Sequence, residues 1–529
     1  MKKELLLGDG AVARAAIDAG ISGVYAYPGT PSTEITEYIQ AHARPGVHTD
    51  WCANEKTALE AALGVSYVGR RALVCMKHVG LNVAADAFIN SAMSGVNGGL
   101  VVVVADDPSM HSSQNEQDSR FYGKFAFVPT LEPASQQEAY NMVGYAFELS
   151  EQLSLPVLVR LTTRMAHSRA VIEVSDQAKS VPPITFPKNP ADWILLPVNA
   201  RRRYKEVIDQ WPTVEDLSEN SPYNTFTTGT DKTLGIIASG IGVNYVMENF
   251  PSGCPYPILK ISQYPLPKKL VRRLGELCSA ILVVEDGQPF IEEQVRGTLP
   301  TETKITGRLD GVLPRVGELT PDNVRLALFG PRSAEGQAAK ASDCVVARPP
   351  ALCTGCGHRL MYEALNQVVA TKADCKVFSD IGCYTLGALP PLRAINSCID
   401  MGASITMAKG AADAGLHYSV AVIGDSTFTH SGMTGLLDAV NNKSAITVII
   451  SDNLTTAMTG GQDSAGTGRL EQICLGLGVE ANHLHVVIPL PKNIEQITTI
   501  ISSEIEYRGV SVIIPRRECI QTLKKRHKK

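Results

Sequence analysis

The chain has 529 residues, enough for roughly three domains of ordinary size. Apolar residues make up 44% and charged residues 19%, as in globular proteins, and the net charge of −4 gives no reason to expect nucleic acid as a partner. No stretch resembles a signal peptide or approaches the roughly 18 consecutive apolar residues of a membrane span. We therefore expect a cytoplasmic protein with no membrane partner, in which most of the 12 cysteines are core thiols rather than a disulfide framework.

Residues 1–165 alternate helix and strand patterns. A helix is expected over 11–19, and a loop with the sequence YPGTPSTE carries Thr30 beyond the end of the first strand. A further helix pattern begins near Glu55. Strands are predicted over 23–27, 72–75 and 100–105. This order predicts an α/β fold with a doubly wound parallel sheet, in which ligands bind at the carboxyl ends of the strands.

The middle of the chain contains a loose stretch and a second sheet unit. Prolines and a triple arginine interrupt residues 166–230, which we interpret as a connecting segment. Residues 231–335 form the second unit, with strands expected over 235–238, 257–261 and 281–284. The turn at 240–242 lacks the third glycine of a dinucleotide fingerprint, so we expect it to pack a helix on a strand rather than bind a nucleotide.

The last domain, residues 346–529, follows a proline-rich linker. An apolar strand turns sharply at Gly424, Asp425 and Ser426, and the next strand, over 446–450, precedes Asn453. Neighbouring parallel strands end at the same edge of a sheet, so Asp425 and Asn453 are expected to meet there. Carboxylate and amide oxygens beside a glycine turn suit Mg²⁺ together with phosphate oxygens. An ordinary strand, turn and helix is the alternative that the GDS motif alone favours.

This stretch, which ends in SDNLTTAMTGGQ, resembles the diphosphate-binding motif of thiamine diphosphate enzymes, and in particular that of the 2-oxoacid:ferredoxin oxidoreductases. It departs at Ser426, where the family usually has glycine. YPGTPSTE, NEKTALEAALG and MKHVGLN are similar to the pyrimidine-binding domain of indolepyruvate:ferredoxin oxidoreductase α subunits, and YPLP and VVEDG to their transketolase C-terminal-like domain. The resemblance implies that the three domains occur in this order along nearly the whole chain.

The resemblance also implies roles for single residues. By position, Glu55 matches the acid that binds N1′ of the cofactor's aminopyrimidine and promotes loss of the proton from C2; a helix N-terminal acid without such a role is the alternative. Mg²⁺ is implied at Asp425, Asn453 and Thr455. The implied contacts of thiamine diphosphate are Thr30, Gly424, Asp425, Ser426, Asn453, Thr455 and Thr459. Candidate substrate residues are His78 and Asn82, beyond a strand end, and Arg120, because the stretch SAMSGVNGG has no arginine of the kind that pyruvate-specific relatives use.

Four cysteines form a separate group of candidates. Cys353 and Cys356 make a CxxC, which is compatible with zinc, redox chemistry or coincidence. In pyruvate-type relatives a proximal [4Fe–4S] cluster takes such a pair, a cysteine in the next strand-end loop, and one near the end of the domain. Cys383 and Cys519 match that order. The resemblance thus implies one [4Fe–4S] cluster on these four thiolates.

As a whole, the resemblance implies an oxidoreductase that oxidatively decarboxylates an arylpyruvate, such as indolepyruvate, to an acyl-CoA and passes electrons to ferredoxin. It further implies coenzyme A as a co-substrate and a smaller β subunit in an α₂β₂ assembly. Family α subunits usually continue into a ferredoxin domain, and this chain ends at KKRHKK without one, so we expect an iron–sulfur subunit or the proximal cluster to carry the electrons. A non-oxidative thiamine-dependent decarboxylase and a non-catalytic scaffold subunit remain as alternatives.

Overall fold

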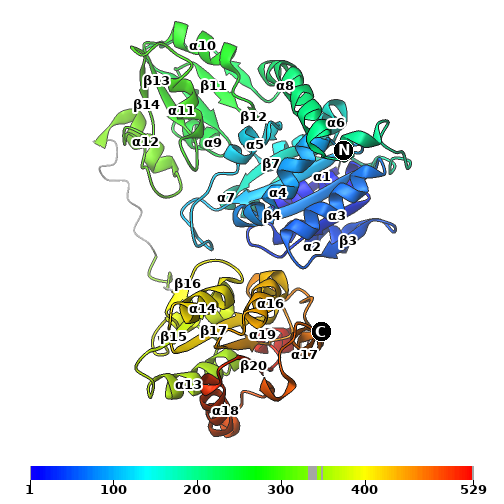
Figure 1. Ribbon diagram of the computed structural model, residues 1–529. Helices are drawn as coiled ribbons and strands as arrows, with labels where there is room; N and C mark the ends of the chain where they lie inside the picture. The colour runs from blue at the N-terminus through cyan, green and yellow to red at the C-terminus, as the bar shows by residue number, and fades with distance from the viewer. Residues whose placement is uncertain (1, 332–341, 347–348, 527–529) are drawn as a thin grey trace. The chain divides into compact units, whose positions relative to one another are not determined.

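The computed structural model describes residues 2–331, 342–346 and 349–526 (Figure 1). Parts of the predicted linker at 346–350, the last residues of the predicted second unit and the end of the basic tail lie outside the described residues. The chain divides into two compact units, Met1–Lys340 and Ala341–Lys529. No helix in the described ranges is both long enough and apolar enough to cross a membrane.

A seven-stranded sheet forms the centre of the first unit, with the order β12-β6-β7-β5-β4-β2-β3. All neighbouring strands are parallel except the pair β6 and β12. The strands are β2 (Gly23–Ala26), β3 (His48–Trp51), β4 (Ala72–Lys77), β5 (Leu100–Asp106), β6 (Thr130–Leu131), β7 (Val157–Thr162) and β12 (Gln263–Tyr264). Because successive residues of a strand face opposite sides, the Val-rich strands supply both cores of the unit.

Helices cover both faces of this sheet, which confirms the predicted doubly wound arrangement. One core packs α1, α2 and α6 on the sheet, and the other packs α3 and α4. The helices of this part are α1 (Gly8–Asp18), α2 (Thr33–His42), α3 (Glu55–Tyr67), α4 (His78–Ser94), α5 (Arg120–Ala126), α6 (Gln136–Leu153) and α7 (Thr163–His167). The turns that follow β2, β4, β5 and β7 therefore meet at one edge of the sheet, which is the edge where ligands bind in such folds.

The stretch predicted to be a connecting segment is more regular than expected. The strand β8 (Arg169–Val174) pairs with β1 (Lys2–Leu7), so the N-terminal fold extends past residue 165. A 23-residue helix, α8 (Pro197–Glu219), follows. Its sequence pattern is weak because Val207, Val214 and Ser218 are its only buried residues and Pro212 interrupts it.

The predicted second sheet unit is a five-stranded sheet with the order β14-β13-β10-β11-β9. Helices again cover both faces, with α10 and α11 in one core and α9 and α12 in the other. The strands are β9 (Thr225–Thr227), β10 (Gly235–Ser239), β11 (Ile258–Ile261), β13 (Ala280–Val284) and β14 (Lys304–Thr306). The helices are α9 (Gly242–Glu248), α10 (Lys268–Leu277), α11 (Phe290–Arg296) and α12 (Pro321–Phe329).

A six-stranded, all-parallel sheet forms the second compact unit, with the order β16-β15-β17-β18-β20-β19. Its strands are β15 (Cys375–Ser379), β16 (Ser397–Cys398), β17 (Tyr418–Gly424), β18 (Ile446–Ser451), β19 (Leu484–Val487) and β20 (Val510–Pro515). Its helices are α13 (Gly357–Val369), α14 (Ala403–Asp413), α15 (Asp425–Thr427), α16 (Met433–Asn441), α17 (Leu470–Gly476), α18 (Ile494–Glu506) and α19 (Ile520–Arg526). Figure 1 shows α13 and α18 on one side of the sheet and α14 and α16 on the other.

Candidate functional site

In the second unit, the strands β17 and β18 place two candidate ligands at one sheet edge. The strands are parallel neighbours with Gly424 in register with Ser451, so Asp425 and Asp452 both follow directly after these paired residues, and Asn453 comes one residue later. The chain must lack a side chain at Gly424, because a β-carbon there would lie 2.6 Å from Cε1 of Tyr384. A short helical turn and a π-helical turn over 428–432 then lead into α16.

Asp425 is a buried carboxylate that lacks its full set of partners. Its side chain is 2% exposed, and among the described residues its Oδ2 accepts no hydrogen bond. Burial, followed by the charge of Asp452, raises the pKa of this carboxyl to about 7. Asp452 itself pairs with Arg516, Nε to Oδ2 at 2.5 Å. A buried oxygen without a donor is stabilised by a cation, so the structure fits Mg²⁺ at Asp425.

Asn453 is held in a fixed orientation. Its Oδ1 accepts from the backbone N–H of Thr455 at 3.1 Å, and its Nδ2 lies 3.2 Å from Nε2 of His358. Burial lowers the pKa of His358 to about 4, so the imidazole is neutral and Nε2 accepts from the amide. His358 was not selected from the sequence, although it stands two residues after Cys356 in CTGCGHR.

The remaining predicted diphosphate contacts form local hydrogen bonds. Ser426 Oγ lies 3.0 Å from Thr456 Oγ1, and the hydroxyl of Thr455 donates to the carbonyl of Gln462 at 2.9 Å. Thr459 donates to Oε1 of the same glutamine at 2.6 Å. These bonds fold the loop after β18 back on itself, beside the turn at Gly424.

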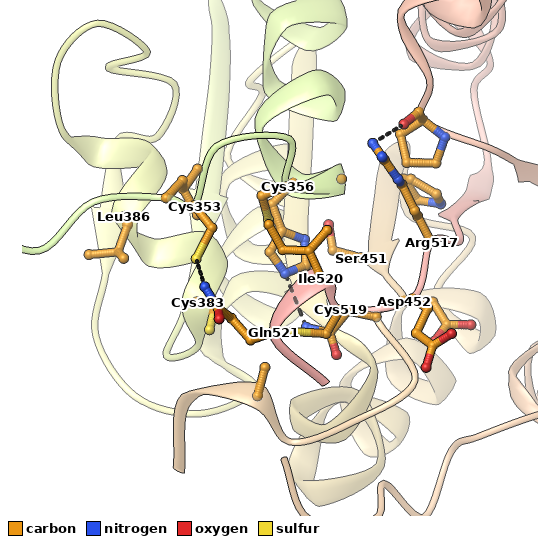
Figure 2. A pocket seen from close by; sticks show the side chains of 18 of the residues that line it. Cys353, Cys356, Cys383, Leu386, Ser451, Asp452, Arg517, Cys519, Ile520 and Gln521 are labelled. Atoms are coloured by element: carbon orange, nitrogen blue, oxygen red, sulfur yellow. Dashed lines mark hydrogen bonds between the residues drawn. The ribbon is translucent and has the colours of Figure 1, made fainter. Parts of the chain in front are cut away.

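The four predicted cysteines line one cavity of about 130 Å³ in this unit (Figure 2). They come from three segments of the chain: the stretch just before α13 (Cys353 and Cys356), the loop after β15 (Cys383) and the segment after β20 (Cys519). The backbone N–H of Cys519 donates to the carbonyl of Asn453 at 3.1 Å, so this cavity adjoins the candidate Mg²⁺ site. Burial, with the neighbouring thiols, raises the pKa of Cys356 and brings that of Cys383 to about 12.

The spacing of these sulfurs bears on the choice of metal. A single zinc with Zn–S bonds of about 2.3 Å holds its sulfurs about 3.8 Å apart. Among the described residues, the only three Cys, His, Asp or Glu ligands that all lie within 4.8 Å of one another are Asp9, Glu34 and His167. No three of the four sulfurs therefore lie within 4.8 Å of one another, which is a wider spread than one zinc ion requires.

In the first unit, Glu55 begins α3. Asn54 caps this helix through a hydrogen bond from the backbone N–H of Thr57 at 2.9 Å, so the position of residue 55 is well defined. Its side chain is 5% exposed and rests on α4, where a β-carbon at Gly80 would lie 2.5 Å from its Oε1. Glycine at position 80 is thus what lets the carboxyl group lie against α4.

A polar cluster surrounds the end of β4 beside the YPGTPSTE loop. Lys77 Nζ donates to the carbonyl of Ser112 at 2.7 Å, and the hydroxyl of that serine donates to the carbonyl of Thr30 at 3.4 Å. His78 Nε2 lies 3.2 Å from Ser113 Oγ, while its buried Nδ1 has no hydrogen-bond partner in the described chain. Burial lowers the pKa of Lys77 to about 8 and that of His78 to about 4. Lys77 was not selected from the sequence, although it stands next to His78 in MKHVGLN.

Asn82 and Arg120 lie elsewhere. Asn82 Oδ1 accepts from the hydroxyl of Tyr122 at 2.7 Å on the surface of α4. Arg120 is fully buried, and its guanidinium donates to Asp118 and contacts Glu285 Oε2 at 2.9 Å. Arg120 stays a predicted substrate ligand, but its guanidinium is already paired with carboxylates from both sheets of this unit.

Comparisons with known proteins agree with this arrangement. Residues 14–204 match the thiamine diphosphate-binding family of pyruvate flavodoxin/ferredoxin oxidoreductases, and residues 380–487 match the C-terminal TPP-binding domain of thiamine pyrophosphate enzymes. The chain therefore contains thiamine diphosphate-binding domains in both compact units.

Whole-chain relatives define the family. The indolepyruvate oxidoreductase subunit IorA of Methanothermobacter thermautotrophicus is 39% identical over 98% of this chain and 87% of its own length. The IorA subunits of Archaeoglobus fulgidus and Pyrococcus abyssi are 37% and 38% identical, each over 98% of this chain and 86% of the relative. The chain belongs to the indolepyruvate oxidoreductase IorA family. This confirms the resemblance drawn from the motifs and makes the chain a subunit of an oxidoreductase.

Proposed function

We propose that the chain catalyses the thiamine diphosphate-dependent oxidative decarboxylation of an arylpyruvate, such as indolepyruvate, to an acyl-CoA, with ferredoxin as the electron acceptor. The identity of 37–39% to IorA subunits along nearly the whole chain carries this proposal. The buried Asp425 carboxylate, with an oxygen lacking a donor, supports it from the geometry. A smaller β subunit, in an α₂β₂ assembly, is the proposed partner.

In the second unit, Asp425, Asn453 and the carbonyl of Thr455 would hold Mg²⁺ and, with it, the diphosphate. The turn after Gly424 offers backbone N–H groups to the phosphates, and Ser426 and Thr459 stay predicted contacts. His358 contributes by accepting from Nδ2 of Asn453, which fixes the amide so that its oxygen, already bound to the N–H of Thr455, would be the atom available to Mg²⁺. When bound, thiamine supplies a carbon nucleophile and an electron sink that no side chain provides.

In the first unit, Glu55 would bind N1′ of the aminopyrimidine, and Thr30 would lie near it in the strand-end loop. For the carboxylate of the substrate Lys77 is a stronger candidate than Arg120, because its ammonium lies beside the Thr30 loop and stays mostly charged at neutral pH. His78 is neutral at that pH, so it would serve as a hydrogen-bond partner for the substrate rather than as a charge. Asn82 stays a weaker candidate, because its amide oxygen already binds Tyr122.

The glycine beneath Glu55 gives a direct test of that assignment. We expect Gly80→Ala to push the Glu55 carboxyl aside and to lower the rate of arylpyruvate oxidation by about 10- to 100-fold, the loss typical of a displacement near 1 Å. Gly64→Ala, in α3 itself, is the control, because a β-carbon at residue 64 meets nothing within 4 Å. That change should keep the rate and raise stability by about 0.5–1 kcal/mol. Equal rates in the two variants would contradict the assignment of Glu55.

We propose that Cys353, Cys356, Cys383 and Cys519 bind one [4Fe–4S] cluster through which electrons leave. Anaerobically purified protein is expected to contain about four irons per chain, as such a cluster requires. Cys383→Ser should remove most of this iron, whereas Cys344→Ser, at an exposed cysteine, should not. Iron and sulfide analysis of the three proteins measures the effect, and iron that survives Cys383→Ser would rule out this ligand set.

The same preparation tests the overall function. Thiamine analysis, with electron paramagnetic resonance after addition of indolepyruvate and coenzyme A, should show bound thiamine and a substrate-reduced iron–sulfur signal. Release of the aldehyde without any electron acceptor would instead identify a non-oxidative decarboxylase.

A further inference from the structure

Three ligand-type side chains meet in the first unit, outside the residues assigned to thiamine and substrate. Asp9 lies in the first turn of α1, Glu34 in the first turn of α2, and His167 at the end of α7. Their oxygen and nitrogen atoms all lie within 4.8 Å of one another, and His167 Nε2 is 3.5 Å from Glu34 Oε2. In the described ranges this is the only such group of three.

Asp9 lacks the partners that a buried carboxylate needs. It is 0% exposed, and neither Oδ1 nor Oδ2 accepts a hydrogen bond from any described residue. Glu34 Oε2 is also buried without a hydrogen bond, and its ion-pair partner is His167 rather than a lysine or arginine. An ionised carboxylate transferred out of water without donors is strongly destabilised, so a proton or a cation must accompany Asp9. The negative charge of the neighbouring Glu34 destabilises an ionised Asp9 further.

The backbone at the start of α1 lies in close contact with the end of α7. Gly8 precedes Asp9, and a β-carbon at Gly8 would lie 2.0 Å from the carbonyl oxygen of Met165 in α7. The backbone N–H of Gly8 donates to the carbonyl of Ser168 at 3.2 Å. Because position 8 has no side chain, the start of α1 lies directly on α7, which brings Asp9 to His167. Any larger residue at position 8 would move them apart.

One member of the group, His167, lines a cavity open to solvent. A cavity of about 330 Å³ is lined by His111, Thr163, Arg164, His167, Ser168 and Glu318. Arg164 in this cavity is paired with Glu318 at 2.7 Å. His167 is partly exposed, so it joins the buried carboxylates to solvent. An ion bound by the three side chains would complete its coordination with water from this cavity.

We propose that Asp9, Glu34 and His167 bind a divalent cation of the Mn²⁺, Fe²⁺ or Zn²⁺ class. Two carboxylate oxygens and one imidazole nitrogen are a ligand set that suits these ions, with water in the open positions. The cation neutralises both carboxylates and ties the starts of α1 and α2 to α7, close to the loop that carries Thr30. The competing occupant is a proton shared by the two acids, since burial and Glu34 raise the pKa of Asp9 well above its usual range. This site is independent of the thiamine proposal.

Binding of Mn²⁺ to the full chain tests the proposal. Mn²⁺ is chosen because it prefers carboxylate and water over the thiolates of the cysteine cavity. Every protein in the experiment also carries Asp425→Asn and is studied without thiamine, so that Mn²⁺ does not bind at the other proposed metal site. Free Mn²⁺ is counted by electron paramagnetic resonance after treatment with a chelator. We expect one Mn²⁺ per chain and a rise in Tm on binding. Asp9→Asn should weaken binding by more than about 100-fold, because loss of a residue that merely orients a metal ligand already costs up to about that much.

His167→Gln should weaken binding in the same way, and because this side chain is partly exposed it keeps the test valid even where Asp9→Asn disturbs folding. His111→Gln is the matched control, since His111 lines the same cavity but is not one of the three ligands. Absence of bound Mn²⁺ in the parent chain, or equal affinity in the His167 and His111 variants, would overturn the proposal and leave the shared proton as the occupant.

Discussion

Replacing Glu55 with glutamine is expected to lower the rate of arylpyruvate oxidation by about 100- to 10,000-fold, the range associated with loss of a positioned acid–base group. Glutamine keeps the size of the side chain and its packing on Gly80 but cannot share a proton with N1′ of the aminopyrimidine. Binding of thiamine diphosphate should change far less than the rate. Initial rates of substrate-dependent acceptor reduction, measured with the β subunit present, give the effect.

Glu60→Gln is the control for this prediction. Glu60 lies on the same helix, is exposed, and pairs with Lys56 on the surface, where an ion pair contributes little to stability. Its replacement should leave the rate unchanged. A Glu55→Gln enzyme with the parent rate would remove Glu55 from the reaction and favour a scaffold role for the chain.

Replacing Asp425 with asparagine is expected to weaken binding of thiamine diphosphate with Mg²⁺ by about 100-fold or more, because one charged ligand of a divalent cation is lost. Isothermal titration calorimetry on the full chain measures this change. Asp438→Asn, at an exposed position on α16, should bind as the parent does. Equal affinity of all three proteins would rule out Asp425 as the metal ligand.

The same substitution has an opposite effect on the cofactor-free chain. Burial raises the folded-state pKa of Asp425 to about 7, above the ordinary value of 3.8, so its ionisation in the folded state is unfavourable. The carboxyl group therefore makes the parent less stable as the pH rises from about 4 to 7, and the full penalty is present above pH 7. Without cofactor, Asp425→Asn should raise Tm above pH 7 and have little effect near pH 4. Thermal unfolding at both pH values separates lost binding from damaged folding.

Much of the fold was predictable, because local patterns encode it directly. The Val-rich run of β5 and the Ile-rich run of β18 are buried on both faces, and strands of this kind occur in parallel sheets covered by helices. Less could be predicted for residues 166–230, where α8 is amphipathic along only a narrow stripe and contains Pro212. Helices held by a few long-range contacts leave little periodic signal for a sequence to show.

By itself, the sequence determined the family, the order of the domains and the candidates at strand ends, because strand, glycine turn and helix patterns are local. Only the tertiary structure decided which side chains meet. It gathered four cysteines from three segments into one cavity and placed His358 against Asn453. It also buried Arg120 among carboxylates that pair with its guanidinium. It also brought Asp9 and Glu34, near the N-terminus, close to His167, more than 130 residues later, although no motif connects the three. Contacts between residues far apart in the chain depend on how helices and sheets pack, and that packing is a property of the whole fold rather than of any one segment.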